Sequence, residues 1–388
     1  MNECIVGWGH SKFGKMDGLS LEQMIVDVSR QAVESAGISF SDIGAIYLGT
    51  FNSGLDAQDF PASLVLQASN DLRFKPATRV ENACATGSAA VYQGLNALRA
   101  GNARFVLCVG AEKMTGLPTA ELGQILLRAS YRAQEVFPVG GFAAAWSALQ
   151  DSYTQAFGEQ DDALAMIAAK NHLNGVDNPY AHIRKDLGFD FCRNVSDKNP
   201  IVVGRLKRTD CSLVSDGAAA IVMTTEDIAR TMPKAVRFRA AQHVSDYLPM
   251  SRRDMVQFEG PATAWARAYR EASVSVNDLS FAEVHDCFTI AELLAYEAMQ
   301  LKPKGQGGHA ILEGLVKKDG KLPVNVTGGL KAKGHPIGAT GVSMHAVAAM
   351  QLTGNAGGMQ LRSPELAAVF NMGGSAVVSY VSILERLI

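Results

Sequence analysis

Short, continuously apolar runs alternate with longer amphipathic segments in the first part of the chain. Residues 4–7, 45–48 and 105–110 are apolar without polar alternation, which is typical of strands buried on both faces. Residues 19–36 have helical spacing, with Ser20 as a possible N-cap and Gly37 as a stop signal, and residues 61–69 also favour a helix. This pattern predicts an α/β fold with a parallel sheet covered by helices on both faces.

A strand, a tight turn and a buried helix are predicted around Cys84. Residues 78–81 are compatible with a β-strand, and residues 88–99 are small and apolar on nearly every face. The turn places Cys84 just before a helix N-terminus, where unpaired backbone N–H groups favour an anion. Cys84 is therefore a candidate thiolate nucleophile, and the alternative is a small buried residue that packs the turn.

The pattern changes between residues 114 and 208. Helical segments near 141–157 and 162–174 are less regular, strands are scarce, and a buried strand returns at 216–223. We interpret residues 114–208 as an insertion that covers the substrate. Residues 1–113 and 209–232 would together form an N-terminal half, interrupted by this insertion. Residues 233–388 would form a C-terminal half.

An internal repeat connects the two halves. At a constant offset of 236 residues, Ser39 and Asp42 align with Ser275 and Asp278, together with several apolar positions around them. The triplet Ala-Thr-Gly precedes a predicted helix twice, ending at Gly87 and at Gly341. The same order of both matches predicts a duplicated βα unit. Equivalent loops of the two copies would meet around one cleft, at the ends of the strands.

The loops expected at this cleft carry reactive residue types. His285-Asp286-Cys287-Phe288 follows an apolar run, His335 precedes Pro336 in a glycine-rich turn, and Asn371-Met372-Gly373 joins two apolar runs. His285, taken alone, is also compatible with a satisfied core histidine. Phosphate-binding and dinucleotide-binding glycine motifs are absent. The arrangement therefore favours Cys84 as an acyl acceptor, with His335 and His285 around it and Gly373 lending a backbone N–H.

Composition narrows the classes of function. The 388 residues are 47% hydrophobic and 19% charged, with a net charge of −2, which gives no support for a nucleic-acid or membrane surface. The six cysteines form no CxxC pair and no local His/Cys cluster with metal spacing, so we expect no metal and a reducing compartment. We find no signal-peptide pattern and no apolar run of membrane-spanning length, and we expect a cytoplasmic protein.

Taken together, these motifs resemble the thiolase superfamily, and more narrowly the sterol-carrier-protein type of thiolase without a lipid-transfer domain. The resemblance spans essentially the whole chain. It is carried by five segments in the family's order: Asn82-Ala83-Cys84-Ala85-Thr86-Gly87, Ser215-Asp216-Gly217-Ala218-Ala219-Ala220, His285-Asp286-Cys287-Phe288, Gly334-His335-Pro336-Ile337-Gly338-Ala339-Thr340-Gly341 and Asn371-Met372-Gly373-Gly374.

The resemblance implies a thiolase fold of two duplicated βαβαβαββ halves in five α-β-α-β-α layers, and it implies roles for single residues. Cys84 would carry the acyl group as a thioester, and His335 would activate its thiol. His285 stands where many thiolases have an asparagine, and with His335 it would form one oxyanion hole. The backbone N–H groups of Cys84 and Gly373 would form the second.

One position departs from the common thiolases. Asn371 stands where they carry a second catalytic cysteine, and an amide does not exchange protons near neutral pH. Because the sterol-carrier type places a cysteine in the His-Asp-Cys-Phe motif, Cys287 is the candidate acid/base, with a packing cysteine as the alternative.

The activity implied is a CoA-dependent acyltransferase that cleaves 3-oxoacyl-CoA or runs the reverse Claisen condensation. Two alternatives stay open: a thiolase-fold aldolase acting on a 3-hydroxyacyl-CoA, and an acyltransferase subunit that needs a small partner protein. CoA and acyl-CoA would be substrates, with no further cofactor. By resemblance we expect a homodimer or a dimer of dimers, with residues 105–110 suited to a buried interface.

Overall fold

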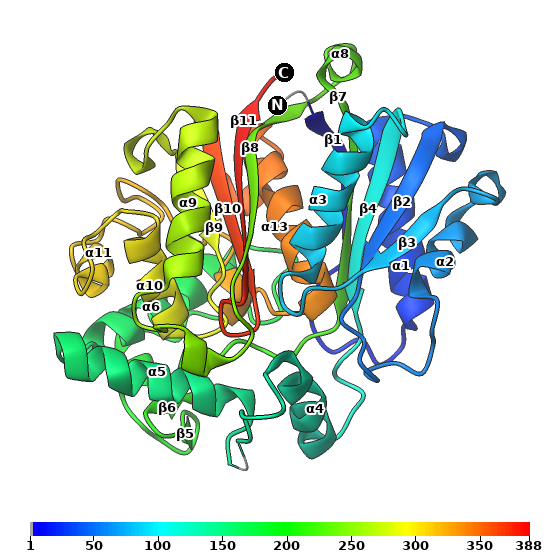
Figure 1. Ribbon diagram of the computed structural model, residues 1–388. Coiled ribbons are helices and arrows are strands. Elements are labelled where there is room, and N and C mark those ends of the chain that lie inside the picture. Colours follow the sequence, from blue (N-terminus) through cyan, green and yellow to red (C-terminus); the bar gives the residue numbers. More distant parts are fainter. Residues whose placement is uncertain (1–2, 138) are drawn as a thin grey trace.

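A single mixed β-sheet runs through the computed structural model, which describes residues 3–137 and 139–388 (Figure 1). Its order is β3-β2-β4-β7-β1-β8-β11-β10-β9, and β5 and β6 form a separate pair. The strands are β1 (Glu3–His10), β2 (Ile43–Gly49), β3 (Ala77–Val80), β4 (Phe105–Glu112), β5 (Ile201–Val203), β6 (Leu206–Lys207), β7 (Gly217–Thr225), β8 (Val236–Ser245), β9 (Phe281–Val284), β10 (Leu366–Gly373) and β11 (Val378–Arg386).

The α-helices lie on both faces of the sheet and in the segment between β4 and β7. They are α1 (Leu21–Ala36), α2 (Pro61–Leu64), α3 (Thr86–Arg99), α4 (Thr119–Leu126), α5 (Phe142–Phe157), α6 (Asp161–Val176), α7 (Phe189–Arg193), α8 (Glu226–Ala229), α9 (Glu259–Ala272), α10 (Thr289–Ala298), α11 (Gly307–Leu312), α12 (Gly329–Ala332) and α13 (Ile337–Leu352). None of the helices in the described residues is long and apolar enough to cross a membrane.

The two halves of the sheet repeat one topology. From the outer edge inward, the first half reads β3-β2-β4-β7-β1 and the second half reads β9-β10-β11-β8. Val324 makes a parallel bridge to Ala282 of β9, at the position that corresponds to β3. Two residue pairs between β1 and β8, Cys4 with Arg237 and Ile5 with Val236, join the halves.

Local capping repeats as well. Ser20 and Gly37 cap α1 at its two ends, as the sequence predicted. After α1, the Ser39 backbone N–H donates to Asp42 at 2.9 Å, and after α9 the Ser275 N–H donates to Asp278 at 2.7 Å. The residues that revealed the repeat therefore make the same turn in both halves.

Five layers follow from this duplication (Figure 1). Helix α1 packs on the outer face of the first half-sheet, while α9 and α10 cover the outer face of the second. Helices α3 and α13 lie between the half-sheets. Their first turns touch through glycines: a Cβ on Gly87 would lie 2.7 Å from the Val342 nitrogen, and one on Gly341 would lie 2.1 Å from the Ser88 nitrogen.

Two expectations about the strands are wrong. The sheet is mixed, because β7 runs antiparallel to β1 and β4, and β11 runs antiparallel to β8 and β10. Apolar runs without alternation indicate burial on both faces, and the antiparallel strands β7 and β11 show the same burial because they too are covered on both faces. Residues 105–110 also cannot form a subunit interface, because β4 lies between β2 and β7 and is buried along its whole length.

The segment between β4 and β7 holds α4 to α7 with the β5–β6 pair. It lies below the sheet in Figure 1, next to the ends of the strands that carry the candidate residues. Helix α6 packs against α10, α11 and α12 of the second half. The predicted boundaries of the insertion and of the two halves stay predictions.

Candidate active site

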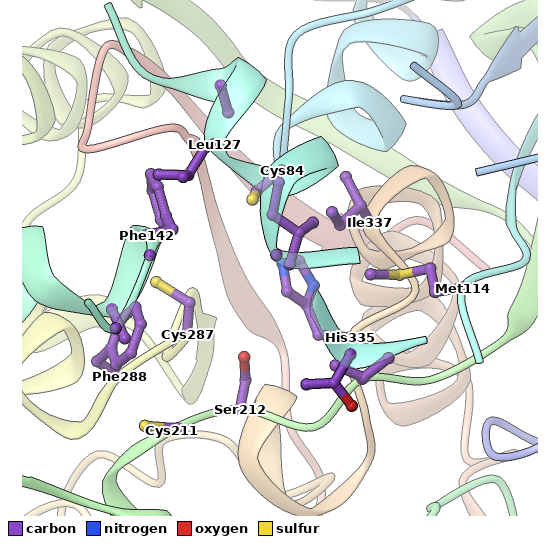
Figure 2. A pocket seen from close by; sticks show the side chains of 18 of the residues that line it. Cys84, Met114, Leu127, Phe142, Cys211, Ser212, Cys287, Phe288, His335 and Ile337 are labelled. Carbon is purple, nitrogen blue, oxygen red and sulfur yellow. The ribbon is translucent and has the colours of Figure 1, made fainter. Parts of the chain in front are cut away.

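Four predicted residues converge from loops far apart in the sequence. Cys84 lies between β3 and α3, His285 and Cys287 lie between β9 and α10, and His335 precedes α13. Cys84 Sγ and one ring nitrogen from each histidine lie within 4.8 Å of one another, and the two imidazole centroids are 5.2 Å apart. Cys287 lines the same cavity (Figure 2). The repeat thus brings its equivalent loops together, as expected.

Asn371 fixes the orientation of this group. Its Nδ2 donates to the Cys84 carbonyl oxygen at 3.1 Å and lies 2.9 Å from His285 Nδ1, while its Oδ1 accepts from Ser88 Oγ at 2.8 Å. Because a carbonyl oxygen only accepts, the NH₂ group must face both Cys84 and His285. His285 Nδ1 then accepts a hydrogen bond, so its proton is on Nε2 and that nitrogen is a donor.

Thr340 assigns the opposite tautomer to His335. Its Oγ1 donates to the Pro336 carbonyl at 3.0 Å, so it accepts from His335 Nδ1 at 2.7 Å. His335 Nε2 therefore carries a free lone pair. This atom is buried and has no hydrogen-bond partner within the described part of the chain. One histidine is thus arranged as a proton donor and the other as a base.

Burial keeps both imidazoles neutral. It lowers the His335 pKa to about 3, with a contribution from the Lys333 charge. It also lowers the His285 pKa well below its ordinary value, and His335 adds to this shift. Neutral imidazole is the form that can accept the proton of a thiol.

In the free site, the Cys84 thiol has a higher pKa than its place before a helix led us to expect. Burial raises its pKa to about 12, although hydrogen bonds from the backbone of Gly374 and of Cys84 itself act in the opposite direction. Desolvation thus outweighs the helix N-terminus, which begins only at Thr86. Cys84 rests as a thiol and needs a base to become a nucleophile.

The backbone donor facing Cys84 belongs to Gly374, one residue beyond the predicted Gly373. Gly374 has φ of +59°, a left-handed conformation that suits glycine, in the turn after β10. Gly373 is packed tightly: a Cβ there would lie 2.3 Å from the Asn82 carbonyl oxygen. The oxyanion role of Gly373 stays a prediction, and Gly374 is a donor that the sequence did not single out.

Cys287 is buried as a thiol beside Cys84. Burial raises its pKa well above the ordinary value, and the nearby Cys84 adds to the rise. Asp286 anchors the loop: it accepts from the Leu330 N–H at 2.6 Å and from Asn171 Nδ2 at 2.8 Å. Burial raises the pKa of Asp286, with Glu292 as the next cause.

Glu112 is a second anchor that sequence reasoning missed. It is buried at the end of β4 and accepts from Thr50 Oγ1 at 2.8 Å, from the Phe51 and Asn52 N–H groups, and from the Gly338 N–H at 2.9 Å. Burial raises the pKa of Glu112 above its ordinary value, because it outweighs the lowering effect of these hydrogen bonds. The loop after β2 and the turn at the start of α13 are thereby tied together. In the sequence, the only sign of this role is the position of Glu112 at the end of an apolar run.

A cavity of about 530 Å³ opens beside Cys84, Cys287 and His335 (Figure 2). Its wall is mainly apolar and includes residues of the segment between β4 and β7. Prominent lining side chains are Phe51, Met114, Leu127, Phe142, Phe288 and Ile337. The polar reacting groups thus sit at one end of an apolar pocket, an arrangement typical of small-molecule sites.

The duplicated five-layer fold, with a cysteine at a helix start and two histidines, defines a thiolase-fold enzyme site. Family profiles agree: "Thiolase, N-terminal domain" matches residues 4–187 and "Thiolase C-terminal domain-like" matches residues 241–386. An acetyl-CoA acetyltransferase of Methanothermobacter thermautotrophicus is 33% identical over 99% of this chain and 99% of its own length. Sterol carrier protein 2 of Oryctolagus cuniculus is 31% identical over 97% of this chain and 71% of its own.

The chain therefore belongs to the thiolase family and is a thiolase-type acyltransferase. Solved structures show the same fold. An Ltp2-ChsH2(DUF35) aldolase superposes with a TM-score of 0.85 at 20% identity, over 99% of this chain and 98% of the other. Human mitochondrial 3-ketoacyl-CoA thiolase in complex with CoA superposes with a TM-score of 0.76 at 16% identity, over 100% and 98%.

Proposed function

We propose that this chain cleaves 3-oxoacyl-CoA with CoA, or runs the reverse Claisen condensation, through an acyl group on Cys84. The observation that carries this proposal is the buried Nε2 of His335, which has no hydrogen-bond partner in residues 3–137 and 139–388 and lies in the cluster with Cys84 Sγ and His285. A neutral base beside a thiol supports nucleophilic catalysis.

In the first half-reaction, Cys84 Sγ attacks the C3 carbonyl carbon and its proton passes to His335 Nε2. The negative charge that develops on the C3 oxygen would be held by backbone N–H donors of Cys84 and of the Gly373–Gly374 turn. The C2–C3 bond then breaks, its electron pair stays on C2, and the acyl group remains on Cys84. His285 Nε2–H would hold the thioester oxygen of the departing enolate. One such donor is worth roughly 3 kcal/mol in the transition state.

The enolate carbon needs a proton, and Cys287 is our candidate donor. In the condensation direction the same thiol, as thiolate, would remove a proton from the acetyl-CoA methyl group. Cys287→Ala should leave acylation of Cys84 within a few-fold of wild type but lower condensation by roughly 100-fold. Deuterium exchange into the acetyl-CoA methyl group measures this step directly, with Cys211→Ala, another thiol of the cavity wall, as the control. Exchange at the wild-type rate in Cys287→Ala would assign the proton to another group.

Before the second half-reaction, the proton that His335 took from Cys84 passes to the Cys287 thiolate, which restores His335 as a neutral base and Cys287 as a thiol. The CoA thiol then attacks the thioester carbon of acyl-Cys84. The thiol proton passes to His335, the Cys84–carbon bond breaks, and the proton returns to the Cys84 sulfur. CoA and acyl-CoA serve as substrates, and the proposal needs no further cofactor.

The size of the cavity favours substrates with acyl groups larger than acetyl. Its volume and its apolar wall would accommodate an extended or branched hydrocarbon chain next to Cys84. We expect kcat/KM for thiolysis to rise from acetoacetyl-CoA to longer 3-oxoacyl-CoA substrates. A series of acyl lengths in the thiolysis assay measures this, and a maximum at acetoacetyl-CoA would contradict it.

The alternative is a retro-aldol cleavage of a 3-hydroxyacyl-CoA, and the fold likeness to the Ltp2-ChsH2(DUF35) aldolase favours it as second candidate. That reaction yields a free aldehyde or ketone and leaves no acyl group on the enzyme. Two separate incubations distinguish the reactions. A thiolase converts 3-oxoacyl-CoA and CoA into two acyl-CoA products, whereas an aldolase releases an aldehyde or ketone from 3-hydroxyacyl-CoA. We further propose that the chain forms a homodimer or a dimer of dimers and that it is cytoplasmic. The alternative of an acyltransferase subunit that needs a small partner protein also stays open.

A further inference from the structure

Three side chains of metal-ligand type meet next to the cavity, two of which, Cys84 and His335, line it, although no local spacing in the sequence indicated this. Cys84 Sγ and one nitrogen each of His285 and His335 lie within 4.8 Å of one another. Tetrahedral zinc, with bonds of about 2.3 Å to sulfur and about 2.0 Å to nitrogen, holds such atoms roughly 3.5 Å apart. Side-chain rotations that close the group by about 1 Å would place all three on one ion.

The hydrogen bonds of His335 are an independent sign of a ligand. The ring is buried, Nδ1 is held by Thr340, and Nε2 has no partner among the described residues. Buried polar atoms are seldom left without a partner. A histidine whose one nitrogen is fixed by a hydrogen bond while the other presents its lone pair is arranged like the histidines of metal sites.

We propose that Cys84, His285 and His335 reversibly bind a thiophilic divalent cation such as Zn²⁺, with one coordination position left open. Binding forms a metal–sulfur bond and releases the Cys84 thiol proton to solvent, and His335 supplies its Nε2 lone pair. His285 binds through Nε2 once the proton there has moved to Nδ1. The Asn371 amide then turns so that its Oδ1 accepts from Nδ1, and it gives up the hydrogen bond that it donates to the Cys84 carbonyl in the metal-free site. Mg²⁺ and Ca²⁺ prefer oxygen ligands and do not occupy this site.

This site gives the cation an inhibitory role, and that consequence rests on the proposed function. A metal on Cys84 occupies the sulfur that would attack the substrate. Conversely, an acyl group on Cys84 removes the thiolate ligand. Metal binding and acylation therefore exclude each other.

Cobalt(II) is the probe of choice, because its absorption reports both a thiolate ligand and tetrahedral geometry. The purified full chain, stripped of metal, is titrated with Co²⁺ and then with Zn²⁺. We expect one Co²⁺ per chain with a thiolate-to-cobalt charge-transfer band, displacement by Zn²⁺, and no displacement by Mg²⁺. Cys84→Ala should abolish the band, and His335→Ala should weaken binding at least about tenfold. Cys211→Ala, which removes another thiol of the cavity wall, should leave binding unchanged.

A charge-transfer band that survives in Cys84→Ala, or no stoichiometric Co²⁺ binding by the wild-type chain, overturns the proposal. Circular dichroism establishes that each variant is folded. Because the titration contains no substrate, its outcome does not depend on acyl transfer. If Co²⁺ binds as expected but no acyl group forms on Cys84, the proposed function fails and the metal site stands.

Discussion

Among single residues, Asn371 fixes the hydrogen bonds of His285 and of the Cys84 carbonyl next to the reacting sulfur. Its amide joins Ser88 on α3, the Cys84 carbonyl and the His285 ring. Side chains of this kind pre-organise donors before the substrate arrives. From the sequence, Asn371 was notable only because common thiolases have a cysteine at this position. Its hydrogen-bond partners Ser88 and Cys84 lie about 280 residues away and His285 about 90 residues away, so no local pattern connects them.

Asn371→Ala should slow acylation of Cys84 by roughly 100-fold, because His285 loses the partner that fixes its tautomer. Single-turnover kinetics with acetoacetyl-CoA measures this step. Ser88→Ala is the matched control, since it removes a contact to Asn371 but none to His285, and it should stay within a few-fold of wild type. Equal losses in both variants would mean that packing of the amide, and not its donation to His285, matters.

The pKa of Cys84 shows what sequence reasoning cannot weigh at this scale. The position of Cys84 before a helix was predicted correctly, and so was its proximity to His285 and His335. The desolvation of its sulfur was not predicted, and this desolvation is the largest cause of the raised Cys84 pKa, although the residue is only partly buried.

At the scale of elements, the contact between α3 and α13 positions Cys84 against His335. The two helices begin immediately after these residues, and glycines let their backbones approach. Gly341→Ala should destabilise the fold by about 3 kcal/mol or more, because the new Cβ meets backbone atoms that have no room to move. Chemical denaturation measures this change. Gly123→Ala in α4, where a Cβ meets open space, is the control and should be neutral or slightly stabilising. Unchanged stability in Gly341→Ala would contradict the close packing.

Asp216 joins β7 to the chain that leaves β4. It is buried and accepts from the Met114 and Thr115 N–H groups at 2.6 and 2.8 Å and from Met16 at 3.1 Å, with Lys113 as its ion-pair partner. Burial raises the Asp216 pKa, but these hydrogen bonds outweigh it, so the pKa lies below its ordinary value. A depressed carboxyl pKa stabilises the fold above the unfolded-state pKa, and this contribution is lost as pH falls through the folded-state pKa.

Asp216→Asn should therefore lower the free energy of unfolding by roughly 3 kcal/mol at pH 7. The difference from wild type should begin to shrink as the pH falls below about 4, the ordinary Asp pKa of the unfolded chain, and should be lost as the pH falls through the lower pKa of the native carboxyl. Urea denaturation at several pH values measures this. The exposed Asp227 offers the matched substitution Asp227→Asn, which should change little. A difference that does not vary between pH 7 and the acid range would show that the Asp216 charge contributes nothing.

At the scale of the whole molecule, duplication explains why one site gathers residues from both halves. The repeat was visible in the sequence because Ser39 and Asp42 make the same turn as Ser275 and Asp278. The bounds of α1, α5 and α6 were also predicted closely, since periodicity and caps are local signals. Strand direction in β7 and β11, and the buried anchors Glu112 and Asp286, depend on tertiary contacts, and the apolar pattern does not record these.

Intact-protein mass spectrometry followed by peptide mapping shows whether Cys84 carries the acyl group. After brief incubation of the wild-type chain with acetoacetyl-CoA, we expect one added acyl mass on the peptide that contains Cys84, removed again by CoA. Cys84→Ala should show no adduct. An unmodified Cys84 in a folded enzyme that consumes its substrate, or an adduct on Cys287 instead, would contradict the account.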